Sequence, residues 1–503
     1  MDALPAGLDP RLRVRAQRGA SWVREHAAAG RTVTVVHHID ADGVTSGAIA
    51  AETLSRAGVA HILQPVKALD QFHLDIIARV DPQALWFCDL GSTAYMHFPT
   101  TPRLVCDHHE LVRDGQEESF AHVNPLLDGI EGNTISGAGC CYLVAAAMDG
   151  RNADLLPLAL VGASGDRQDR HDGGFAGTNA LLVADGQSRG LVSQAVDITW
   201  FGPETRPLRK FFQLSREPGV PTVSGDARSA ERLCMELGIP IEAGGVERSW
   251  GALDDRERLL LRSRLASILV DCGLAHQVPA LFRRVVTICN EAPATPLREL
   301  QEFSTLLNST ARYDRPEIGL AVCRGDRGAA YREALDLLLD HRKHLVGALD
   351  ALVRAGVTRR VAIQHVHLQD RVRDTVVGIV CGMALGGGVE LDRDKVLVGL
   401  AWTPDGRTKI SGRAPHELHA RGIDLSMAMR EAAAGVGGQG GGHKGAAGAT
   451  IPRDRESDFL AELDRIAAGQ IGVRSAPTPP RDAAPEAPRS LPVLANRGQQ
   501  RLM

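Results

Sequence analysis

Aspartate and histidine residues follow four short apolar segments in the N-terminal third of the chain. These polar residues are His38, Asp40 and Asp42 after the first segment, Asp89 after the second, Asp107, His108 and His109 after the third, and Asp166 after the fourth. Carboxylates and imidazoles without a thiolate suit Mn²⁺ or Mg²⁺ better than they suit structural zinc. The four clusters therefore predict a site for divalent metal ions, provided that the fold brings them together.

The spacing within the first cluster indicates how ligands could be shared. In an extended chain, residues i, i+2 and i+4 point to the same side, so His38, Asp40 and Asp42 would face one site. Three ligands on one side are enough to be shared between two metal ions. A pair of ions about 3.5–4 Å apart stabilises both the attacking and the leaving oxygen of an in-line displacement. The chemistry predicted from these residues is metal-dependent hydrolysis.

Each of these residues also has a plainer interpretation. A single aspartate after a strand is most often the N-cap of the next helix, and a single buried histidine is most often a hydrogen-bonded core residue. Four clusters in one stretch are harder to explain by caps alone, which favours the metal site. We expect His37 to lie on the opposite face of its strand, and we favour structural roles for His122, His171 and Asp169.

A second candidate site lies near the C-terminus. Residues 435–448 (GVGGQGGGHKGAAG) are dominated by glycine, and no Gly-Lys-Ser/Thr sequence identifies them as a Walker A loop. Glycines let backbone amides approach a phosphate closely, and His443 would add charge. Upstream, Ser411 and Arg413 end a predicted strand, and a guanidinium can bind a phosphate through two hydrogen bonds. A flexible linker is the alternative for the glycines alone, whereas the two features together predict a phosphate-binding surface.

The elements that must position these residues indicate an α/β fold. Short β-branched runs alternate with helical segments, which is typical of a mostly parallel sheet. Predicted strands cover residues 32–37, 61–65, 84–88 and 103–106, and predicted helices cover residues 8–29, 47–57, 69–79 and 140–148. We interpret residues 158–164 as a further strand that delivers Asp166. Because the carboxyl ends of parallel strands share one edge of a sheet, where ligands bind, all four clusters would converge there.

The rest of the chain divides into a connector, a second α/β region and a tail. Long helices are predicted over residues 254–270 and 331–354, strands over 361–366, 375–381, 395–403 and 449–451, and a helix over 426–434. The predicted domains are an N-terminal parallel-sheet domain (residues 1–235), a helical connector (236–355), a smaller C-terminal α/β domain (356–472) and a disordered Pro- and Arg-rich tail (473–503).

Composition narrows the class of protein. The 503 residues carry a net charge of −4, which excludes a globally cationic coat but not a local basic groove. Aromatic residues make up 4% of the chain, which argues against nucleic-acid binding mainly by base stacking. None of the nine cysteines forms a Cys-x-x-Cys pair, and no segment has the pattern of a signal peptide or a membrane span. We therefore expect a soluble cytoplasmic protein with free thiols and no membrane association.

The same residues resemble the motifs of a known family. Four motifs resemble, in order, those of the DHH phosphoesterase superfamily: HIDADG (38–43), Asp89, DHH (107–109) and GD (165–166). Two more resemble its companion DHHA1 domain: SGR (411–413) and GGGH (440–443). Within the superfamily the chain is most similar to the archaeal RecJ-like exonucleases, on two stretches: GASGDRQD (162–169) and LNSTARYDRPEIGLAVCRGD (307–326).

The resemblance implies a role for each matching residue. The implied metal ligands, shared between two Mn²⁺ or Mg²⁺ ions, are His38 and Asp40 for one ion, Asp42, His108 and Asp166 for the other, and Asp89 as a bridge. Asp107 would orient the imidazoles, and His109 would contact the scissile phosphate. The residues implied to hold the nucleic-acid strand across the inter-domain cleft are Ser411, Arg413, Gly441, Gly442 and His443.

The resemblance also implies a function. A RecJ-like protein would hydrolyse single-stranded DNA or RNA from an end to nucleoside monophosphates, in DNA repair or replication, and associate with the GINS replication complex. Two alternatives stay open. One is a phosphodiesterase for short oligoribonucleotides or cyclic dinucleotides, and the other is a replication scaffold related to the eukaryotic helicase cofactor of the same superfamily. The presence of all six candidate ligands counts against the scaffold, because such scaffolds tend to lose them.

Overall fold

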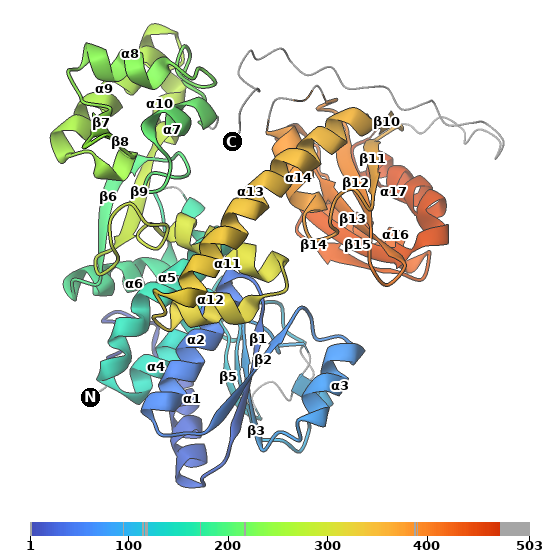
Figure 1. Cartoon of the computed structure of the whole chain (residues 1–503). Coiled ribbons are helices and arrows are strands. Elements are labelled where there is room, and N and C mark those ends of the chain that lie inside the picture. Colours follow the sequence, from blue (N-terminus) through green and yellow to red (C-terminus); the bar gives the residue numbers. More distant parts are fainter. Residues whose placement is uncertain are drawn as a thin grey trace. The chain divides into compact units, whose positions relative to one another are not determined.

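The chain forms two compact units, Met1–Leu338 and Leu339–Met503 (Figure 1). The structure, a computed structural model, describes residues 3–472 except for residues 94, 113, 114, 116–118, 172, 216, 217, 387, 388 and 390. The tail predicted to be disordered, residues 473–503, lies outside the described residues. Within the described part, no helix has both the length and the apolar character needed to cross a membrane. The four-domain division expected from the sequence stays a prediction.

A five-stranded parallel sheet forms the centre of the first unit. The strand order is β2-β1-β3-β4-β5, and every neighbouring pair is parallel. The strands are β1 (Val33–His38), β2 (His61–Val66), β3 (Ala84–Cys88), β4 (Arg103–Cys106) and β5 (Ala121–Val123). The predicted α/β class with an N-terminal parallel sheet is therefore confirmed. The sequence did not predict β5, because three residues carry too little pattern.

Helices cover both faces of this sheet. The helices of the main core on one face are α1 (Pro10–Ala28), α2 (Ala41–Arg56), α4 (Gly137–Met148) and α5 (Leu156–Gly165), while α3 (Gln71–Arg79) packs on the other (Figure 1). Side chains alternate between the two cores, so Trp86 of β3 lies in the main core and Phe87 in the smaller one. Because both faces are buried, the strands are apolar and polar residues collect at their ends.

Two elements near the candidate site differ from the sequence prediction. Residues 158–164, interpreted as a strand, lie inside helix α5, and Asp166 directly follows that helix. A short apolar run does not distinguish a strand from a buried helix, and α5 is buried against α2 and α4. Helix α2 begins at Ala41 because Asp40 caps it, accepting the backbone N–H of Gly43 at 3.0 Å. The extended alternation therefore ends at Asp40, and Asp42 lies in the first helical turn.

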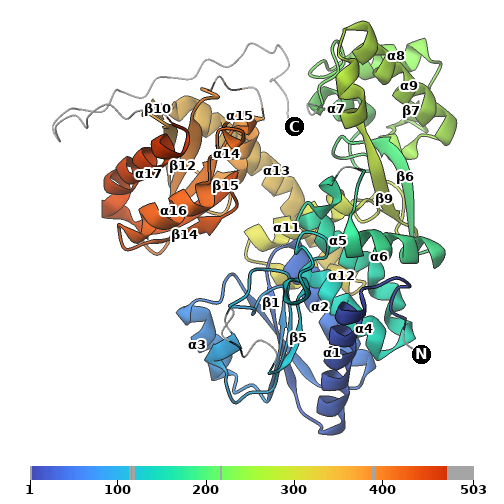
Figure 2. The ribbon, with the colours of Figure 1, turned by 180° about the vertical axis from the view of Figure 1, so that it is seen from behind.

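The first unit also contains a helical insert, residues 199–281, on a two-stranded stem. The stem pairs β6 (Val192–Ile198) with β9 (Phe282–Ile288) in antiparallel register (Figure 2). The elements of the insert are α7 (Leu208–Leu214), α8 (Ser229–Glu236), β7 (Glu242–Ala243), β8 (Val246–Glu247), α9 (Asp255–Asp271) and α10 (Val278–Leu281). The insert has its own apolar core, which includes Trp250. Helix α6 (Gly177–Ser188) precedes the stem, and helices α11 (Leu300–Arg312) and α12 (Pro316–Cys323) follow it.

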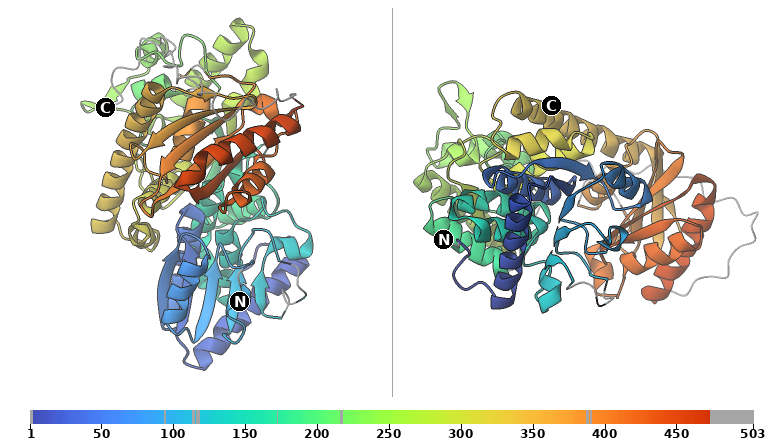
Figure 3. Two further views of the ribbon diagram at one scale, coloured as in Figure 1. Left: turned by 90° about the vertical axis from the view of Figure 1, so that its right-hand side faces the viewer. Right: turned by 90° about the horizontal axis from the view of Figure 1, so that it is seen from below.

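The second unit is built on a six-stranded mixed sheet of order β10-β11-β12-β13-β15-β14. Its strands are β10 (Thr358–Arg359), β11 (Ile363–Gln369), β12 (Val396–Trp402), β13 (Arg407–Arg413), β14 (Gln439–Gly442) and β15 (Ala446–Pro452). Its helices are α14 (Val377–Leu385), α15 (His416–His419), α16 (Leu425–Ala434) and α17 (Glu456–Gln470), preceded by α13 (Ala329–Ala355). The left view of Figure 3 shows the red helix α17 against the orange strands, on the face that α16 also covers.

Two predictions for this unit need correction or refinement. Residues 375–381, predicted to form a strand, contribute mainly to helix α14. The β-branched run there favours a strand locally, but β11 and β12 are parallel, and a parallel pair needs a crossover, usually a helix. The glycine-rich residues are not a linker, because Gln439–Gly442 form the edge strand β14, paired with β15.

Candidate metal centre

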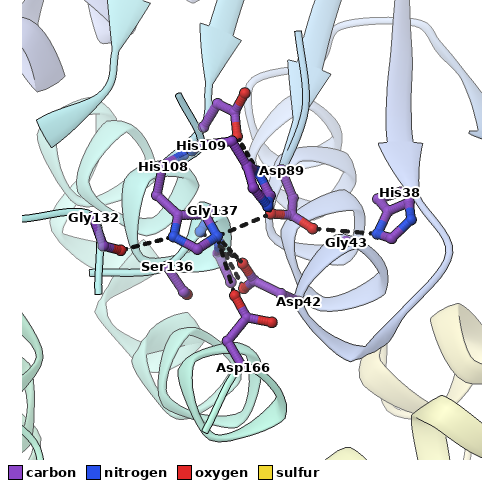
Figure 4. A network of polar contacts seen from close by, with 12 residues as sticks. His38, Asp42, Gly43, Asp89, His108, His109, Gly132, Ser136, Gly137 and Asp166 are labelled. Carbon is purple, nitrogen blue, oxygen red and sulfur yellow. Dashed lines mark hydrogen bonds and ion pairs between the residues drawn. The ribbon is translucent and has the colours of Figure 1, made fainter. Parts of the chain in front are cut away.

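Six acidic and imidazole side chains meet at the carboxyl edge of the parallel sheet. Figure 4 shows all of them except Asp40. The end of β1, the start of α2, the loops after β3 and β4 and the residue that follows α5 supply them; they are His38, Asp40, Asp42, Asp89, His108 and Asp166. They form overlapping groups, each with ligand atoms within 4.8 Å of one another: His38, Asp40 and Asp89; Asp42, His108 and Asp166; and Asp89, His108 and His109. The fold thus brings together all six residues expected to bind metal.

His108 stands at the middle of one group. Its Nε2 lies 3.1 Å from Asp166 Oδ2, 3.5 Å from Asp89 Oδ1 and 3.8 Å from Asp42 Oδ2. Its other ring nitrogen, Nδ1, lies 2.8 Å from the carbonyl oxygen of Gly132 and donates its hydrogen there. When the ring is neutral, this hydrogen bond leaves the lone pair on Nε2, facing the carboxylates, as a metal ligand requires.

Asp89 joins this group to a second one. Its Oδ2 lies 3.6 Å from Nδ1 of His38, which is itself 3.0 Å from Asp40 Oδ1. Its Oδ1 faces His108 instead. The two oxygens of one carboxylate therefore face two different ligand groups, the arrangement that a bridging ligand would adopt.

Asp107 supports His109 rather than both imidazoles. Its Oδ1 accepts hydrogen bonds from the backbone N–H groups of His108 and His109 and lies 2.8 Å from the ring Nδ1 of His109. Burial raises the pKa of Asp107, but the hydrogen bond from His109 and the nearby imidazole charges hold it well below its usual value. The ring of His108 is oriented by the Gly132 carbonyl, which the sequence did not reveal. The side chain of His109 is 59% exposed and can be reached by a substrate.

The backbone around the centre is tightly specified. Asp89 has φ +62°, a left-handed conformation that non-glycine residues hold only when their surroundings enforce it. Asp42 accepts hydrogen bonds from the backbone N–H groups of Gly137 (2.7 Å) and Ala138 (3.0 Å) at the start of α4. A Cβ on Gly162 of α5 would lie 2.3 Å from Asp42 Oδ1. Glycine at this position lets α5 approach the carboxylate, a requirement that the sequence alone did not show.

The electrostatics of the centre favour a cation. Burial and the neighbouring charges of Asp89 and Asp166 raise the pKa of Asp42 well above its usual value. Burial opposes protonation of His108, yet the surrounding carboxylates raise its pKa. Two buried atoms, Asp89 Oδ1 and His108 Nε2, have no hydrogen-bond partner among the described residues. Crowded carboxylates and bare ligand atoms are the surroundings that a divalent ion would stabilise, so the residues present fit the predicted metal.

Two residues on α11 extend the site and were missed as individual candidates. Asn308 accepts the backbone N–H of Ala41 through Oδ1 at 3.0 Å, so it holds the start of α2. One turn later, Arg312 donates a hydrogen bond to the carbonyl oxygen of Asn308. Burial lowers the pKa of Arg312, although the charge of Asp40 acts in the opposite direction. In the part of the chain that the structure describes, no carboxylate forms an ion pair with Arg312. The available signal was the i, i+4 spacing of the two residues on one helix face.

The remaining acidic and imidazole candidates have structural contacts. His37 is buried, its Nδ1 lies 2.8 Å from the carbonyl oxygen of His38, and burial lowers its pKa to about 4. His122 contacts the Ser92 hydroxyl at 3.1 Å. His171 lies 3.1 Å from a backbone carbonyl oxygen, and Asp169 pairs with an arginine. None of these four belongs to a ligand group of the described residues.

The candidate substrate residues lie together within the second unit. Arg413 donates to the Ser411 hydroxyl at 3.2 Å. In the sheet, Ser411 is paired with Gly448, and Gly448 with Gly441, so all three lie in one row. Gly442 ends β14 with φ +135°, and the exposed His443 follows in the turn to β15. This row therefore has no side chain larger than that of Ser411, and the Arg413 guanidinium lies next to the Ser411 hydroxyl.

Comparisons with family models match both units. Residues 359–469 match the DHHA1 domain, and residues 200–281, almost the whole helical insert, match the DHH-CID domain. An uncharacterized protein from Methanocaldococcus jannaschii is 24% identical over 455 residues, which cover 87% of this chain and 94% of that protein.

Solved structures share the fold. RecJ from Thermus thermophilus in complex with Mn²⁺ is 18% identical, with a TM-score of 0.55; the match covers 93% of this chain and 56% of that one, so this chain spans about half of that RecJ. A manganese-bound exonuclease RecJ is 17% identical, with a TM-score of 0.53, and the match covers 93% and 96% of the two chains. CDC45 from Entamoeba histolytica is 11% identical, with a TM-score of 0.60 and coverage of 90% and 99%.

Proposed function

The chain belongs to the DHH superfamily and carries a DHHA1 domain, and from this premise we propose that it is a metal-dependent exonuclease. The proposed substrate is single-stranded DNA or RNA, hydrolysed from an end to nucleoside monophosphates. One observation carries the proposal: ligand side chains from five separate elements converge around two buried atoms, Asp89 Oδ1 and His108 Nε2, that have no hydrogen-bond partner among the described residues.

Two groups of residues would hold the metal ions. We assign His38 and Asp40 to one ion, Asp42, His108 and Asp166 to the other, and Asp89 to both. Mn²⁺ or Mg²⁺ bound there would supply activation of water and neutralisation of the charge that develops on the phosphate. Oxygen and imidazole ligands suit these ions, and RecJ from Thermus thermophilus was solved with each of them.

His109 is the proposed contact to the scissile phosphate. Its Nδ1 is held by Asp107, which leaves Nε2 for a substrate on a side chain that is 59% exposed. The hydrogen bond to Asp107 is the main cause that raises the pKa of His109. An imidazole that Asp107 holds in place can donate a hydrogen bond to a phosphate oxygen as the negative charge of that oxygen grows.

Arg312 is proposed as a second anion contact. Its side chain is half-buried and interacts with the charge of Asp40, and its hydrogen bond to Asn308 uses one backbone carbonyl. A guanidinium has five N–H donors, so several remain for a phosphate oxygen. In the second unit, we propose that Ser411, Arg413, Gly441, Gly442 and His443 bind phosphates of the nucleic-acid strand.

A direct assay tests the proposal. Single-stranded DNA and RNA labelled at the 5′ or the 3′ end are digested with Mn²⁺, and the first labelled product is identified. Release of a mononucleotide from one end, and its absence with the Asp89→Asn variant, is the expected result. Cleavage that persists unchanged in that variant would remove the metal assignment.

The same assay distinguishes the alternatives. Hydrolysis confined to substrates of a few nucleotides would replace the exonuclease with a short-substrate phosphodiesterase. No hydrolysis of any of these substrates would favour the scaffold alternative. The association with the GINS complex is tested separately, by co-purification with the purified complex.

A further inference from the structure

A buried ion pair links the helical insert to the segment that carries a metal-ligand candidate. Asp169, three residues after Asp166, is 5% exposed, and its Oδ2 accepts hydrogen bonds from Arg283 Nη1 at 2.5 Å and from Gln301 Nε2 at 2.8 Å. Arg283 belongs to β9, the strand that leaves the insert. Charge-assisted hydrogen bonds to a buried carboxylate are strong, so this contact fixes the path of the chain immediately after Asp166.

The few residues between Asp166 and Asp169 form a stiff connection. Arg167 has φ +60°, a left-handed conformation, and a short 3₁₀ turn, Gln168–Arg170, follows it. The Gln168 amide lies 3.2 Å from the carbonyl oxygen of Gly132 and 3.4 Å from His108 Nδ1, and it is held by Asn179 at 2.7 Å. A shift of Asp169 would therefore move Asp166 and also disturb the carbonyl that orients His108.

On the other side, the pair connects to the core of the insert. Arg283 lies opposite Asp197 in the register of the stem. The Asp197 carboxylate accepts the indole N–H of Trp250 at 3.1 Å, and Trp250 is buried in the apolar core of the insert. A continuous series of contacts thus runs from this core through the stem to the metal-ligand candidates.

We propose that Asp169 and Arg283 are positioning residues that couple the helical insert to the metal centre, so that the placement of the stem sets the affinity for metal. This inference rests on the proposed function, because it requires that Asp166 and His108 bind metal. Supporting partners of metal ligands commonly change metal affinity by about 10–100-fold when they are removed. By reciprocity, metal bound at the centre stabilises the stem to the same extent.

The alternative is that the pair only holds the fold together. The insert offers a control, because Arg248 and Glu257 form a second ion pair of the same length (2.5 Å) that has no contact with the centre. The two arginines are similarly exposed, whereas Glu257 is more exposed than Asp169. Loss of either pair should lower the stability of the first unit. Only loss of the Asp169–Arg283 pair should change the binding of metal.

Equilibrium titration of Mn²⁺ into the full-length wild type and the Asp169→Asn, Arg283→Gln and Arg248→Gln variants tests the coupling. The expected result is binding weakened about tenfold in the first two variants and unchanged in Arg248→Gln. Wild-type affinity in folded Asp169→Asn and Arg283→Gln, or equal weakening in Arg248→Gln, would overturn it. Absence of Mn²⁺ binding by the wild type itself would instead overturn the proposed function, and the coupling with it.

A measurement on the wild type alone keeps the inference testable if a variant fails to fold. Hydrogen exchange is followed with and without Mn²⁺ for peptides from the stem strand β9 and from β12 of the second unit. Slower exchange in β9 on addition of Mn²⁺, with β12 unchanged, is expected from the coupling. Exchange in β9 that does not respond to bound Mn²⁺ would contradict it.

Discussion

The metal centre and the glycine-rich surface of the DHHA1 domain differ in how firmly the chain fixes their side chains. Asp42 and Asp89 are 0% and 3% exposed, and backbone donors or an enforced left-handed conformation fix each of them. In the second unit, His443 is exposed and nothing lies within 4 Å of a Cβ added to Gly441. We therefore expect a single substitution at the metal centre to abolish catalysis. A single substitution on the DHHA1 surface should only weaken the binding of substrate.

The largest expected effect is at Asp89, whose carboxylate faces both ligand groups. Asparagine tolerates the left-handed backbone at this position, so Asp89→Asn should fold while it removes the negative charge. We expect a loss of activity of at least about a thousandfold in kcat, because both metal groups lose a ligand. Circular dichroism would check the fold. A variant with near wild-type kcat would show that the centre is not the catalytic site.

The next largest effect concerns metal binding and stability. A ligand that binds only the folded state at about 100 times its Kd stabilises that state by about 2.7 kcal/mol. We expect saturating Mn²⁺ to raise the melting temperature of the wild type and of Arg413→Ala equally, and to leave Asp89→Asn nearly unchanged. Thermal denaturation with and without EDTA measures this. Equal stabilisation of all three proteins would place the bound metal elsewhere.

A pair of glycine substitutions compares the packing of the two regions directly. Alanine is normally the better helix former, yet Gly162→Ala would place a methyl group 2.3 Å from Asp42 Oδ1, which two backbone donors hold in place. We expect this variant to lose about 1–3 kcal/mol of stability, whereas Gly441→Ala, with open space around it, should be near neutral. Urea denaturation distinguishes them, and similar stability of the two variants would contradict the contrast.

The sequence predicted the strands and the polar residues that follow them, but it did not predict the features that depend on contacts between helices. Periodicity predicted β1, β3 and β4, and the polar residues after these strands predicted the centre, because strand ends in a parallel sheet must share an edge. Periodicity failed for α5 and α14, because apolar or β-branched runs are equally compatible with strands and with buried helices. Only the tertiary packing determines which of the two forms. Gly162, Asn308 and Arg312 were missed because their roles are close contacts across helices, which a one-dimensional pattern does not contain.

The smallest effect is expected at Arg413, where the guanidinium lies beside Ser411 on β13. Arg413→Ala removes a charge-assisted contact to a phosphate at a site that other residues share, so we expect KM to rise about tenfold, or about 1.4 kcal/mol, with little change in kcat. Arg465→Ala is the matched control, because Arg465 pairs with Glu462 on the exposed side of α17. Steady-state kinetics on labelled single strands would measure both. If Arg413→Ala instead lowered kcat as strongly as Asp89→Asn, the DHHA1 surface would have to act in the chemical step, and the division between a rigid centre and a graded binding surface would fail.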